Sequence, residues 1–329
     1  MIDLPEPKEA LSKAQAREIF AAILDGKTKP DAIRQFLVQL AARGETSDEI
    51  AAAAEEMRAR MIVVAAPENA IDVCGTGGDG SHSLNISTAT ALVVAACDIP
   101  MAKHGNRAAS SKSGAADTLE ALGLDLQKAA TGGEETLREI GIAFFFAPNH
   151  HPALGGLAAI RKAIGSRTIF NLLGPLCNPA QVKRQLIGVA SLDLVTTYAE
   201  AAAQLDYTKI MIVSGEEGLD ELSISGPSKV AIVEGSTITY SRIAPEDFGL
   251  PRHDAEAIRG GDAVYNAGAL KALLEGDTSA YRDSVLLNSA AALMVAGEVD
   301  NWEAGIEEAG EALDKGLANA LLNCWIANQ

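Results

Sequence analysis

The first 65 residues carry three runs in which apolar side chains recur at helical spacing. Residues 26–30 and 44–47 separate these runs. Ser47, Asp48 and Glu49 stand before an alanine-rich stretch and supply the polar side chains that favour a helix start. Because no β-rich stretch interrupts the region, the pattern predicts a small helical bundle.

From residue 70 onward, short apolar runs alternate with longer helical ones. The runs expected to form strands are residues 71–74, 99–104, 142–147, 185–189, 209–213, 229–233 and 237–240. Helices are expected at residues 86–97, 115–122, 266–276 and 279–297. Apolar strands that alternate with helices form a parallel sheet covered on both faces. The sequence therefore predicts a larger α/β unit around a central, mostly parallel sheet.

Composition limits the classes of partner. With 329 residues the chain is long enough for two domains, and 48% apolar against 22% charged residues excludes general disorder. The formal charge is −17, from 27 basic and 44 acidic residues. Binding to nucleic acid depends on Lys and Arg side chains that neutralise phosphates, so we expect no nucleic-acid partner.

The cysteines and the amino terminus bear on the compartment. Cys74, Cys97, Cys177 and Cys324 are scattered without metal-ligand spacing, which is typical of free thiols in a reducing compartment. The first residues lack a secretory pattern, and no stretch approaches about 18 consecutive apolar residues. We therefore expect a cytoplasmic protein with no membrane partner.

Four glycines in six residues follow the first expected strand: Gly75, Gly77, Gly78 and Gly80. Glycine allows successive backbone N–H groups to converge on one anion. Residues 85–88 then open a helix, where free N–H groups attract negative charge. The stretch is a candidate phosphate site, and a tight turn with a capped helix is the alternative.

Two other nucleotide-binding motifs fit this stretch poorly. Gly75, Gly77 and Gly80 satisfy the dinucleotide pattern G-x-G-x-x-G, but that fold needs its third glycine inside the helix. Here the helix is expected to start near Ile86, and Asp98 precedes the second strand instead of ending it. A P-loop is disfavoured because no Gly-Lys-Ser/Thr follows.

A second polar cluster, residues 103–114, follows the next strand. Lys103, Arg107 and Lys112 lie there among several hydroxyls, which concentrates positive charge in an acidic protein. Both clusters are expected at the carboxyl edge of the sheet, where ligands of open α/β folds bind. Together they indicate a ligand with more than one phosphate group, whereas a solvated charged loop is the alternative for the second cluster.

A family resemblance emerges from longer strings in these and later segments. Between residues 75 and 223 the chain contains, in this order, GTGGDG, NIST, KHGNRAASSKSG, FAPNHHPA, RTIFNLLGPLCNPA, QLIGV and GLDELS. This series resembles the anthranilate phosphoribosyltransferase family over nearly the whole chain. The resemblance implies transfer of the phosphoribosyl group of 5-phosphoribosyl 1-diphosphate to the amino group of anthranilate, with release of pyrophosphate.

The resemblance also implies which residues bind the donor. Those around the diphosphate are Gly75, Gly78, Asp79, Ser83, Asn85, Ile86, Ser87 and Thr88. Those that close over the sugar phosphate and diphosphate are Lys103, His104, Gly105, Asn106, Arg107, Ala108, Ala109, Ser110 and Ser111, with Ala115 lining the same site. Lys103, Asn106 and Arg107 are expected to position the transition state. No residue is expected to act as a nucleophile.

Metal and acceptor sites follow from the same resemblance. Two Mg²⁺ ions are implied, one held by Ser87 and Glu221 and the other by Asp220 and Glu221. Oxygen ligands suit Mg²⁺, although an acidic pair in a loop is otherwise often just solvated.

Anthranilate is implied to bind at Gly75, Asn106 and Arg161. An arginine can engage the carboxylate of anthranilate through two hydrogen bonds, and a helix-surface arginine is the alternative. His150 and His151 are expected to be structural or to line the acceptor channel.

The family fold implies a discontinuous domain division and a homodimer. The small helical domain would be residues 1–66, with residues 152–178 returning to it, and the α/β domain would be residues 67–151 and 179–329. Two rival functions are a pyrimidine nucleoside phosphorylase of the same fold and a noncatalytic relative that binds nucleic acid. The acidic pair with the long strings disfavours the first, and Arg161 with the acidic charge disfavours the second.

Overall fold

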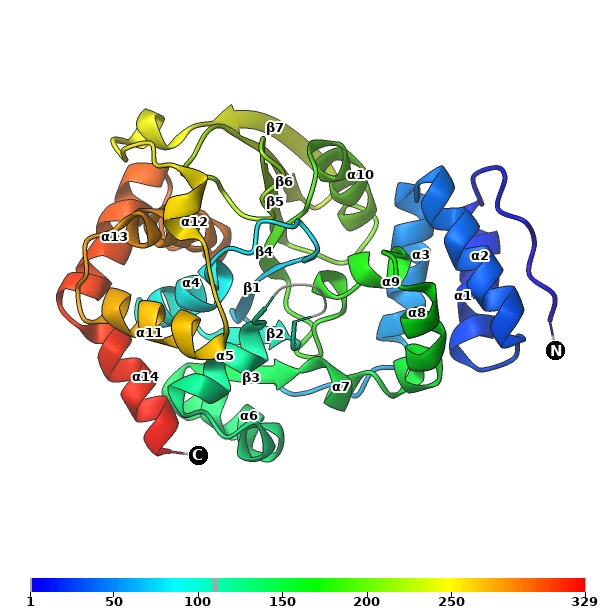
Figure 1. Ribbon diagram of the computed structural model, residues 1–329, viewed down its shortest axis with the longest axis horizontal. Helices are drawn as coiled ribbons and strands as arrows, with labels where there is room; N and C mark the ends of the chain where they lie inside the picture. The colour runs from blue at the N-terminus through cyan, green and yellow to red at the C-terminus, as the bar shows by residue number, and fades with distance from the viewer. Residues whose placement is uncertain (1, 109–111, 329) are drawn as a thin grey trace.

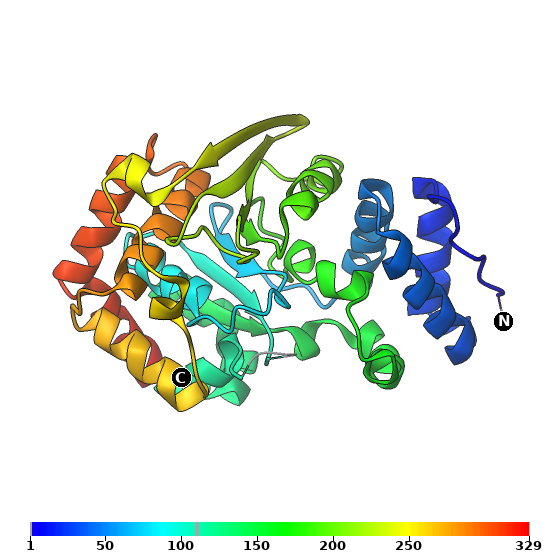
Figure 2. The ribbon, with the colours of Figure 1, turned by 45° about the horizontal axis from the view of Figure 1, so that its top comes forward.

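The computed structural model describes residues 2–108 and 112–328, which form a small helical unit beside a larger α/β unit (Figures 1 and 2). The helical unit contains α1 (Lys13–Leu24), α2 (Pro30–Arg43) and α3 (Ser47–Arg58). Two short helices from later in the chain, α8 (Ala158–Ile164) and α9 (Ile169–Leu172), pack against α2. The helical bundle predicted in the first 65 residues is confirmed.

The start of α3 shows how local chemistry sets a helix boundary. Thr46, one residue before the expected Ser47, caps α3: its hydroxyl accepts from the N–H of Glu49 at 3.3 Å. The Glu49 carboxylate accepts from the N–H of Thr46 at 2.9 Å, which completes a capping box. Glu49 is fully buried and pairs with Arg43 at the end of α2. The same carboxylate therefore fixes both the start of α3 and the turn before it.

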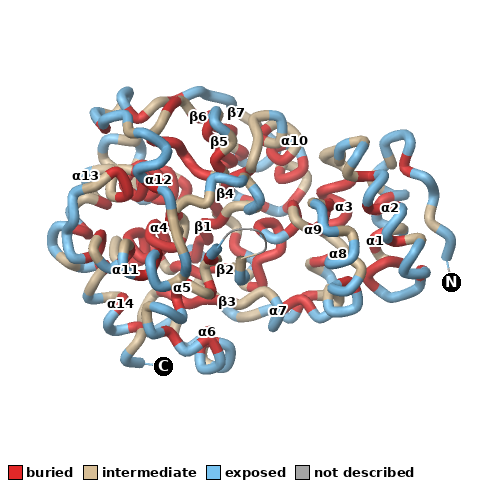
Figure 3. Tube along the Cα trace, in the orientation of Figure 1, coloured by how far each residue is buried: buried red, intermediate tan, exposed pale blue. Residues whose placement is uncertain are grey.

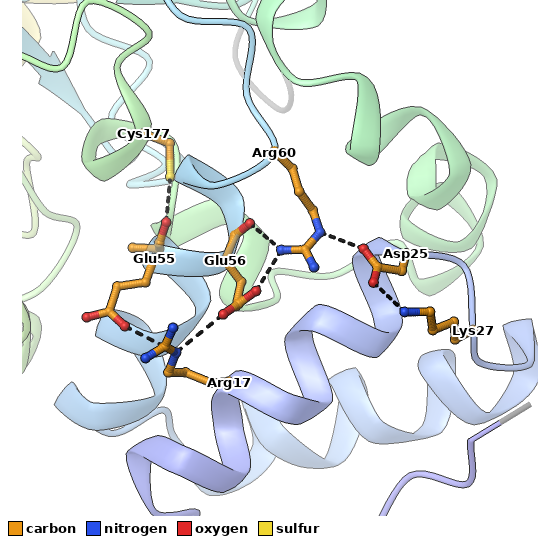
Figure 4. A network of polar contacts seen from close by, with 8 residues as sticks. Arg17, Asp25, Lys27, Glu55, Glu56, Arg60 and Cys177 are labelled. Atoms are coloured by element: carbon orange, nitrogen blue, oxygen red, sulfur yellow. Dashed lines mark hydrogen bonds and ion pairs between the residues drawn. The ribbon is translucent and has the colours of Figure 1, made fainter.

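Apolar packing and surface ion pairs hold the helical unit together. The ring of Phe20 in α1 lies 6.1 Å from that of Phe36 in α2 and 6.2 Å from that of Phe170 in α9. Figure 4 shows ion pairs that join α1 and α3 and the residues just after them, where Arg60 donates to Asp25 at 2.7 Å. Surface pairs contribute little each, so the aromatic cluster is what anchors α9 to the bundle.

The α/β unit is built on a 7-stranded sheet with the order β3-β2-β1-β4-β5-β6-β7. Its strands are β1 (Ile71–Gly75), β2 (Met101–Gly105), β3 (Ile142–Phe146), β4 (Arg184–Gly188), β5 (Lys209–Gly215), β6 (Ser228–Glu234) and β7 (Thr237–Ile243). Strands β1 to β5 pair in parallel, while β6 and β7 are antiparallel additions at one edge. The predicted mostly parallel sheet is confirmed.

Helices cover both faces of this sheet. They are α4 (Ile86–Ala95), α5 (Ala115–Leu122), α6 (Leu126–Ile140), α7 (Ala147–His150), α10 (Leu192–Ala202), α11 (Ala263–Leu274), α12 (Ala280–Ala296), α13 (Trp302–Asp314) and α14 (Leu317–Ala327). On one face α4 and α12 pack on the strands, and on the other α10 packs on β5 and β6 and contacts α3. Within the described part of the chain, no helix combines the length and apolar character needed to cross a membrane.

Alternation along the strands divides the core between the two faces. Leu186 and Met211 join the core beneath α4 and α12, whereas Ile187 and Ile212 join the core shared with α10 and α3. Figure 3 shows the buried trace running through the sheet and on into the helical unit. Because one hydrophobic cluster spans this face of the sheet and the helical unit, the two units do not have separate cores.

A buried carboxylate connects the central strands. Asp72 in β1 is fully buried and accepts from the N–H of His104 at 3.2 Å, from Nδ2 of Asn178 at 2.8 Å and from Nε2 of Gln185 at 3.1 Å. These partners lie in β2, in the segment before β4 and in β4. Burial raises the pKa of the Asp72 carboxyl above its ordinary value. The network fixes the relative positions of three strands at their centre.

The Asp72 network predicts a stability effect. Replacing the carboxylate with a methyl group removes acceptors from three buried donors, so Asp72→Ala should lower the free energy of unfolding by about 3 kcal/mol. Urea titration followed by circular dichroism measures this change. Asp277→Ala, at an exposed position, is the matched control and should stay within about 0.5 kcal/mol of wild type. Equal stability of the two variants would contradict a structural role for Asp72.

Candidate active site

Both predicted phosphate loops leave the same edge of the sheet. Strands β1 and β2 are parallel neighbours, and they end at Gly75 and Gly105. Gly75 also lies in register with Gly188 at the end of β4. The glycine loop, defined as residues 76–80, and the basic loop, residues 106–114, therefore start side by side, as the sequence predicted. This edge is the candidate active site.

An acidic segment lies across the ends of two strands at this edge. A Cβ atom at Gly188 would lie 1.5 Å from the carbonyl oxygen of Asp220, and one at Gly75 would lie 2.2 Å from Asp220 Oδ2. The N–H of Gly77 donates to Asp220 Oδ2 at 2.7 Å. Glycine at position 188 is required for this approach of the Asp220 backbone, and glycine at position 75 leaves room for the Asp220 carboxylate.

Burial raises the pKa of both acids in this segment. The pKa of Asp220 rises to about 7, first because the carboxyl is buried and then because the Asp79 carboxylate is close. The pKa of Glu221 is raised by burial and by the charge of Asp220, while Lys103 opposes this shift. A cation bound beside the two carboxyls would favour their ionised forms.

The residues around the acidic pair fit a hard cation that also binds other oxygens. Among the described residues, no group of three His, Cys, Asp or Glu side chains forms a ready metal centre. Mg²⁺ usually takes one or two carboxylates and completes its shell with waters and substrate phosphates. Asp220 and Glu221 supply the carboxylates, and the anion-friendly loops beside them suit the phosphates.

Lys103 lies beneath the loops as an internal counter-ion. Its side chain is only 2% exposed, and Nζ donates to the carbonyl of Val73 at 2.7 Å and to the Ser87 hydroxyl at 3.5 Å. The charge of Lys103 also favours ionised Glu221. The sequence placed Lys103 in a loop over the donor, whereas the structure places it in the middle of β2, with Nζ directed to Val73 of β1 and Ser87 of α4.

The start of α4 holds most of the remaining donor candidates. Asn85 is the N-terminal residue before the helix, and the backbone N–H of Ser87 points to Glu221. Ile86 and Thr88 are both buried at the start of this helix. Ser83 precedes them and pairs with Arg259 in an isolated bridge.

Asp117 of α5 holds the two ends of the basic loop together. Its Oδ2 accepts from the N–H of Ala108 at 3.1 Å and from the N–H of Gly114 at 2.9 Å. Arg107 is paired with Asp117 at 2.8 Å and with Glu120 at 2.5 Å, and both partners raise its pKa.

Three of the predicted donor residues in this loop cannot be placed. Ala109, Ser110 and Ser111 lie outside the described residues. Ala115, at the start of α5, is a neighbour of Gly105: a Cβ built on Gly105 would lie 3.4 Å from that of Ala115. The described ends of the loop therefore remain at the sheet edge, with Asn106 beside Gly105.

Arg161 stands apart from these residues, on α8 of the helical unit. It is partly exposed, and burial lowers its pKa. Within residues 2–108 and 112–328 its guanidinium has no hydrogen bond or ion pair. A half-buried cation without an acidic partner, in a protein of charge −17, is suited to receive an anionic ligand.

A neutral histidine pair lies between the sheet edge and the segment leading to α8. Nε2 of His104 lies 3.3 Å from Nε2 of His151, and both side chains are buried. Burial and the neighbouring histidines lower the pKa of His104 to about 3 and that of His151 to about 4. His150 is directed elsewhere, with Nδ1 3.1 Å from the carbonyl of Ile62.

Arg167 was not singled out by the sequence analysis, although it is part of the string RTIFN. It precedes α9, and Nη1 donates to the carbonyl of Gly77 at 3.4 Å. A Cβ at Gly78 would lie 3.7 Å from the same nitrogen. Arg167 thus connects the segment between α8 and α9 to the glycine loop. No local pattern could have revealed a contact between residues so distant in the chain.

Comparisons with known proteins agree with this architecture. Residues 67–319 match the family described as "Glycosyl transferase family, a/b domain", and residues 7–61 match "Glycosyl transferase family, helical bundle domain". An anthranilate phosphoribosyltransferase from Novosphingobium aromaticivorans is 60% identical over 324 residues, which cover 98% of each chain. One from Sphingopyxis alaskensis is 58% identical over 323 residues, covering 98% of this chain and 97% of the relative.

Solved structures give the same result. A crystal structure of anthranilate phosphoribosyltransferase from Thermus thermophilus superposes with a TM-score of 0.90 at 39% identity, covering 97% of this chain and 96% of the other. The enzyme from Saccharomyces cerevisiae in complex with PRPP and Mg gives a TM-score of 0.86 at 29% identity, covering 96% and 93%.

The close approach of Asp220 to β4 predicts that Gly188→Ala is disruptive. The added Cβ would overlap the Asp220 carbonyl, so the acidic segment must move, and the free energy of unfolding should fall by at least about 2 kcal/mol. Gly268→Ala is the matched control, because position 268 is helical and its Cβ would meet no atom within 4 Å. Urea titration should show this control equal to or slightly more stable than wild type.

The neutral histidine pair predicts sensitivity to acid. Histidine in the unfolded chain binds a proton near pH 6.5, whereas folded His151 resists protonation until about pH 4. The unfolded state therefore takes up more protons, and stability is lost as the pH falls between these values.

Wild type should lose free energy of unfolding when the pH falls from about 7 to about 5. In His151→Asn this loss should be smaller by about 1–2 kcal/mol. Urea titrations at the two pH values measure it, with His82→Asn in a partly exposed loop as the control. An unchanged pH dependence in His151→Asn would overturn the assignment of a buried neutral ring.

Proposed function

This chain belongs to the anthranilate phosphoribosyltransferase family, and we propose that it transfers the phosphoribosyl group of 5-phosphoribosyl 1-diphosphate to anthranilate. The products are N-(5-phosphoribosyl)anthranilate and pyrophosphate, and the reaction is a step of tryptophan biosynthesis. The observation that carries the proposal is an acidic pair, partly exposed Asp220 and buried Glu221, beside a glycine loop and the start of α4. A diphosphate with Mg²⁺ matches the charge and the hydrogen-bonding groups of this arrangement.

The donor is proposed to bind along the sheet edge. The diphosphate lies against Gly75, Gly78, Asp79 and Ser83 and the residues 85–88, whose backbone N–H groups begin α4. The ribose 5-phosphate lies toward residues 103–111, which run from β2 into the basic loop, and toward Ala115. The guanidinium of Arg107 is paired with the carboxylates of Asp117 and Glu120. To bind a phosphate of the donor, Arg107 must first release these two carboxylates.

Mg²⁺ binding is proposed at Ser87, Asp220 and Glu221, with two ions. When bound, Mg²⁺ neutralises the charge that develops on the diphosphate leaving group. The two carboxylates provide the negative charge that holds it, and their raised pKa values reflect the cost of ionising them without a cation. Lys103 supplies one fixed positive charge beneath the pair.

Anthranilate is proposed to lie between the two units. Arg161 binds its carboxylate, and Gly75 and Asn106 line the slot for the ring and the amino group. The neutral state of His104 suits this place, because a second cation would compete with Arg161 for the carboxylate. The uncharged aniline nitrogen then faces the anomeric carbon from the side opposite the diphosphate.

The reaction is proposed to be a dissociative displacement with an oxocarbenium-like transition state. Lys103, Asn106 and Arg107 position the donor, and no side chain forms a covalent bond with it. Acceleration comes from holding the nucleophile in line and from stabilising the departing charge. The glycine loop contributes backbone N–H groups that already face the diphosphate, so they need not move when the bond between the anomeric carbon and the diphosphate breaks.

The assembly and domain division remain proposals as well. We divide the chain into a helical domain of residues 1–66 and 152–178 and an α/β domain of residues 67–151 and 179–329. The aromatic contact of Phe170 with Phe20 supports assigning α9 to the helical domain. We further propose a cytoplasmic homodimer that pairs through the helical domain.

The function is tested by the loss of anthranilate fluorescence in the presence of 5-phosphoribosyl 1-diphosphate and Mg²⁺. Wild type should consume anthranilate only with both. Arg161→Ala should raise KM for anthranilate by about 30-fold, since it removes a charged hydrogen-bonding partner. Lys162→Ala, the exposed neighbour on α8, is the matched control and should keep the wild-type KM. No turnover by folded wild type would refute the proposed reaction.

The same assay tests the acidic pair. Asp220→Asn and Glu221→Gln should each raise the Mg²⁺ concentration needed for half-maximal rate by about tenfold or more, because each removes a carboxylate ligand. Glu217→Gln, exposed in the same turn, is the control. An unchanged Mg²⁺ requirement in both variants would place the metal elsewhere.

A further inference from the structure

The side-chain oxygen of Asn85 is occupied by two buried donors. Oδ1 accepts from the Thr118 hydroxyl at 2.5 Å and from Nδ2 of Asn266 at 2.9 Å. Thr118 lies in α5 and is fully buried, and Asn266 lies in α11 and is 2% exposed. Two elements far apart in the sequence therefore converge on one amide oxygen at the start of α4.

The orientation of this amide is determined by the groups around it. Asn266 accepts from the N–H of Gly261 at 2.8 Å through Oδ1, so its Nδ2 must face Asn85. Both lone pairs of Asn85 Oδ1 accept hydrogen bonds from these donors, so the amide nitrogen Nδ2 points away from Thr118 and Asn266. Asn85 is partly exposed, and within the described residues Nδ2 donates to no protein group. A flipped amide would set two N–H₂ groups against each other.

The backbone of Asn85 is held as well. The Tyr281 hydroxyl of α12 donates to the Asn85 carbonyl at 3.0 Å. The Thr118 hydroxyl is also 2.8 Å from that of Ser113, which belongs to the basic loop. The hydrogen-bonded chain therefore runs from the basic loop through α5 to the residue that opens α4.

We propose that Thr118 and Asn266 are positioning residues that hold the Asn85 amide with its N–H₂ group toward the diphosphate of the donor. The inference rests on the proposed function, since it takes that diphosphate as the ligand at the start of α4. A donor group there adds to the helix N–H groups, whereas the amide oxygen would repel an anion. Neither residue touches the donor, so each acts only through Asn85.

The decisive variant is Asn266→Asp, which keeps the size of the side chain and turns a hydrogen-bond donor into an acceptor. Asn85 must then rotate its amide to donate to the new carboxylate, which leaves Oδ1 facing the ligand. We expect KM for 5-phosphoribosyl 1-diphosphate to rise at least tenfold, with KM for anthranilate within twofold of wild type. Asn323→Asp, exposed on α14, is the control and should change neither constant.

Variants of Thr118 test the positioning role independently of Asn266. Thr118→Val removes the hydroxyl at constant size and should also raise KM for 5-phosphoribosyl 1-diphosphate. Thr118→Ser keeps the hydroxyl, so its KM for the donor should equal that of wild type. Calorimetry with inorganic pyrophosphate and Mg²⁺ provides a second readout that needs no turnover, and both disruptive variants should bind it more weakly. In an Asn85→Ala background, Asn266→Asp should have no further effect.

The outcomes separate this inference from the proposed reaction. Wild type that neither binds pyrophosphate nor consumes anthranilate would overturn the function itself. Active wild type with an unchanged donor KM and pyrophosphate affinity in Asn266→Asp would overturn the positioning role alone. If Asn266→Asp fails to fold, the Thr118→Val and Thr118→Ser pair decides the question, because a donor KM equal in both refutes the proposal.

Discussion

The approach of the Asp220 backbone to the ends of β1 and β4 is the constraint on which the candidate site depends. A Cβ at Gly188 would overlap the Asp220 backbone, and one at Gly75 would overlap the Asp220 carboxylate. This contact carries a carboxylate pair from a distant segment to the first turn of the glycine loop, where Gly77 binds it. The glycines in this part of the chain thus serve protein packing as well as ligand approach.

The electrostatics of the edge follow from that packing. Bringing Asp220 and Glu221 together in a buried place raises both pKa values, and Asp79 adds to the effect on Asp220. Lys103 offsets part of this charge, but it also donates to a backbone carbonyl and a hydroxyl and is fixed in place. The remaining charge imbalance is the basis of the cation site that we propose here.

Local patterns in the sequence predicted the bundle, the strands and helices α4, α5, α11 and α12, but they did not predict α6, α10, α13 and α14. They also missed contacts between residues that are distant in the chain. Helical periodicity and glycine-bounded strands located the bundle, the sheet and the two loops, since each depends on neighbouring residues. Arg167 was missed because its partner at Gly77 is 90 positions away, and Asn266 because Asn85 is 181 positions away. No local sequence pattern marks either residue, because an arginine after a helix and an asparagine inside a helix both occur frequently without a functional role.

The division of the site between two units gives these long-range contacts their importance. Arg161 stands on α8, which packs against α2, while the glycine loop and the acidic pair belong to the sheet edge. An acceptor held by one unit reaches a donor held by the other only if their separation is fixed to within bonding distance. Arg167 contacts the glycine loop from the segment that continues α8, so it links the unit that carries Arg161 to the loop at the sheet edge. Because Phe170, three residues later, packs against Phe20 in the bundle, residues 167–170 contact both the glycine loop and the helical unit.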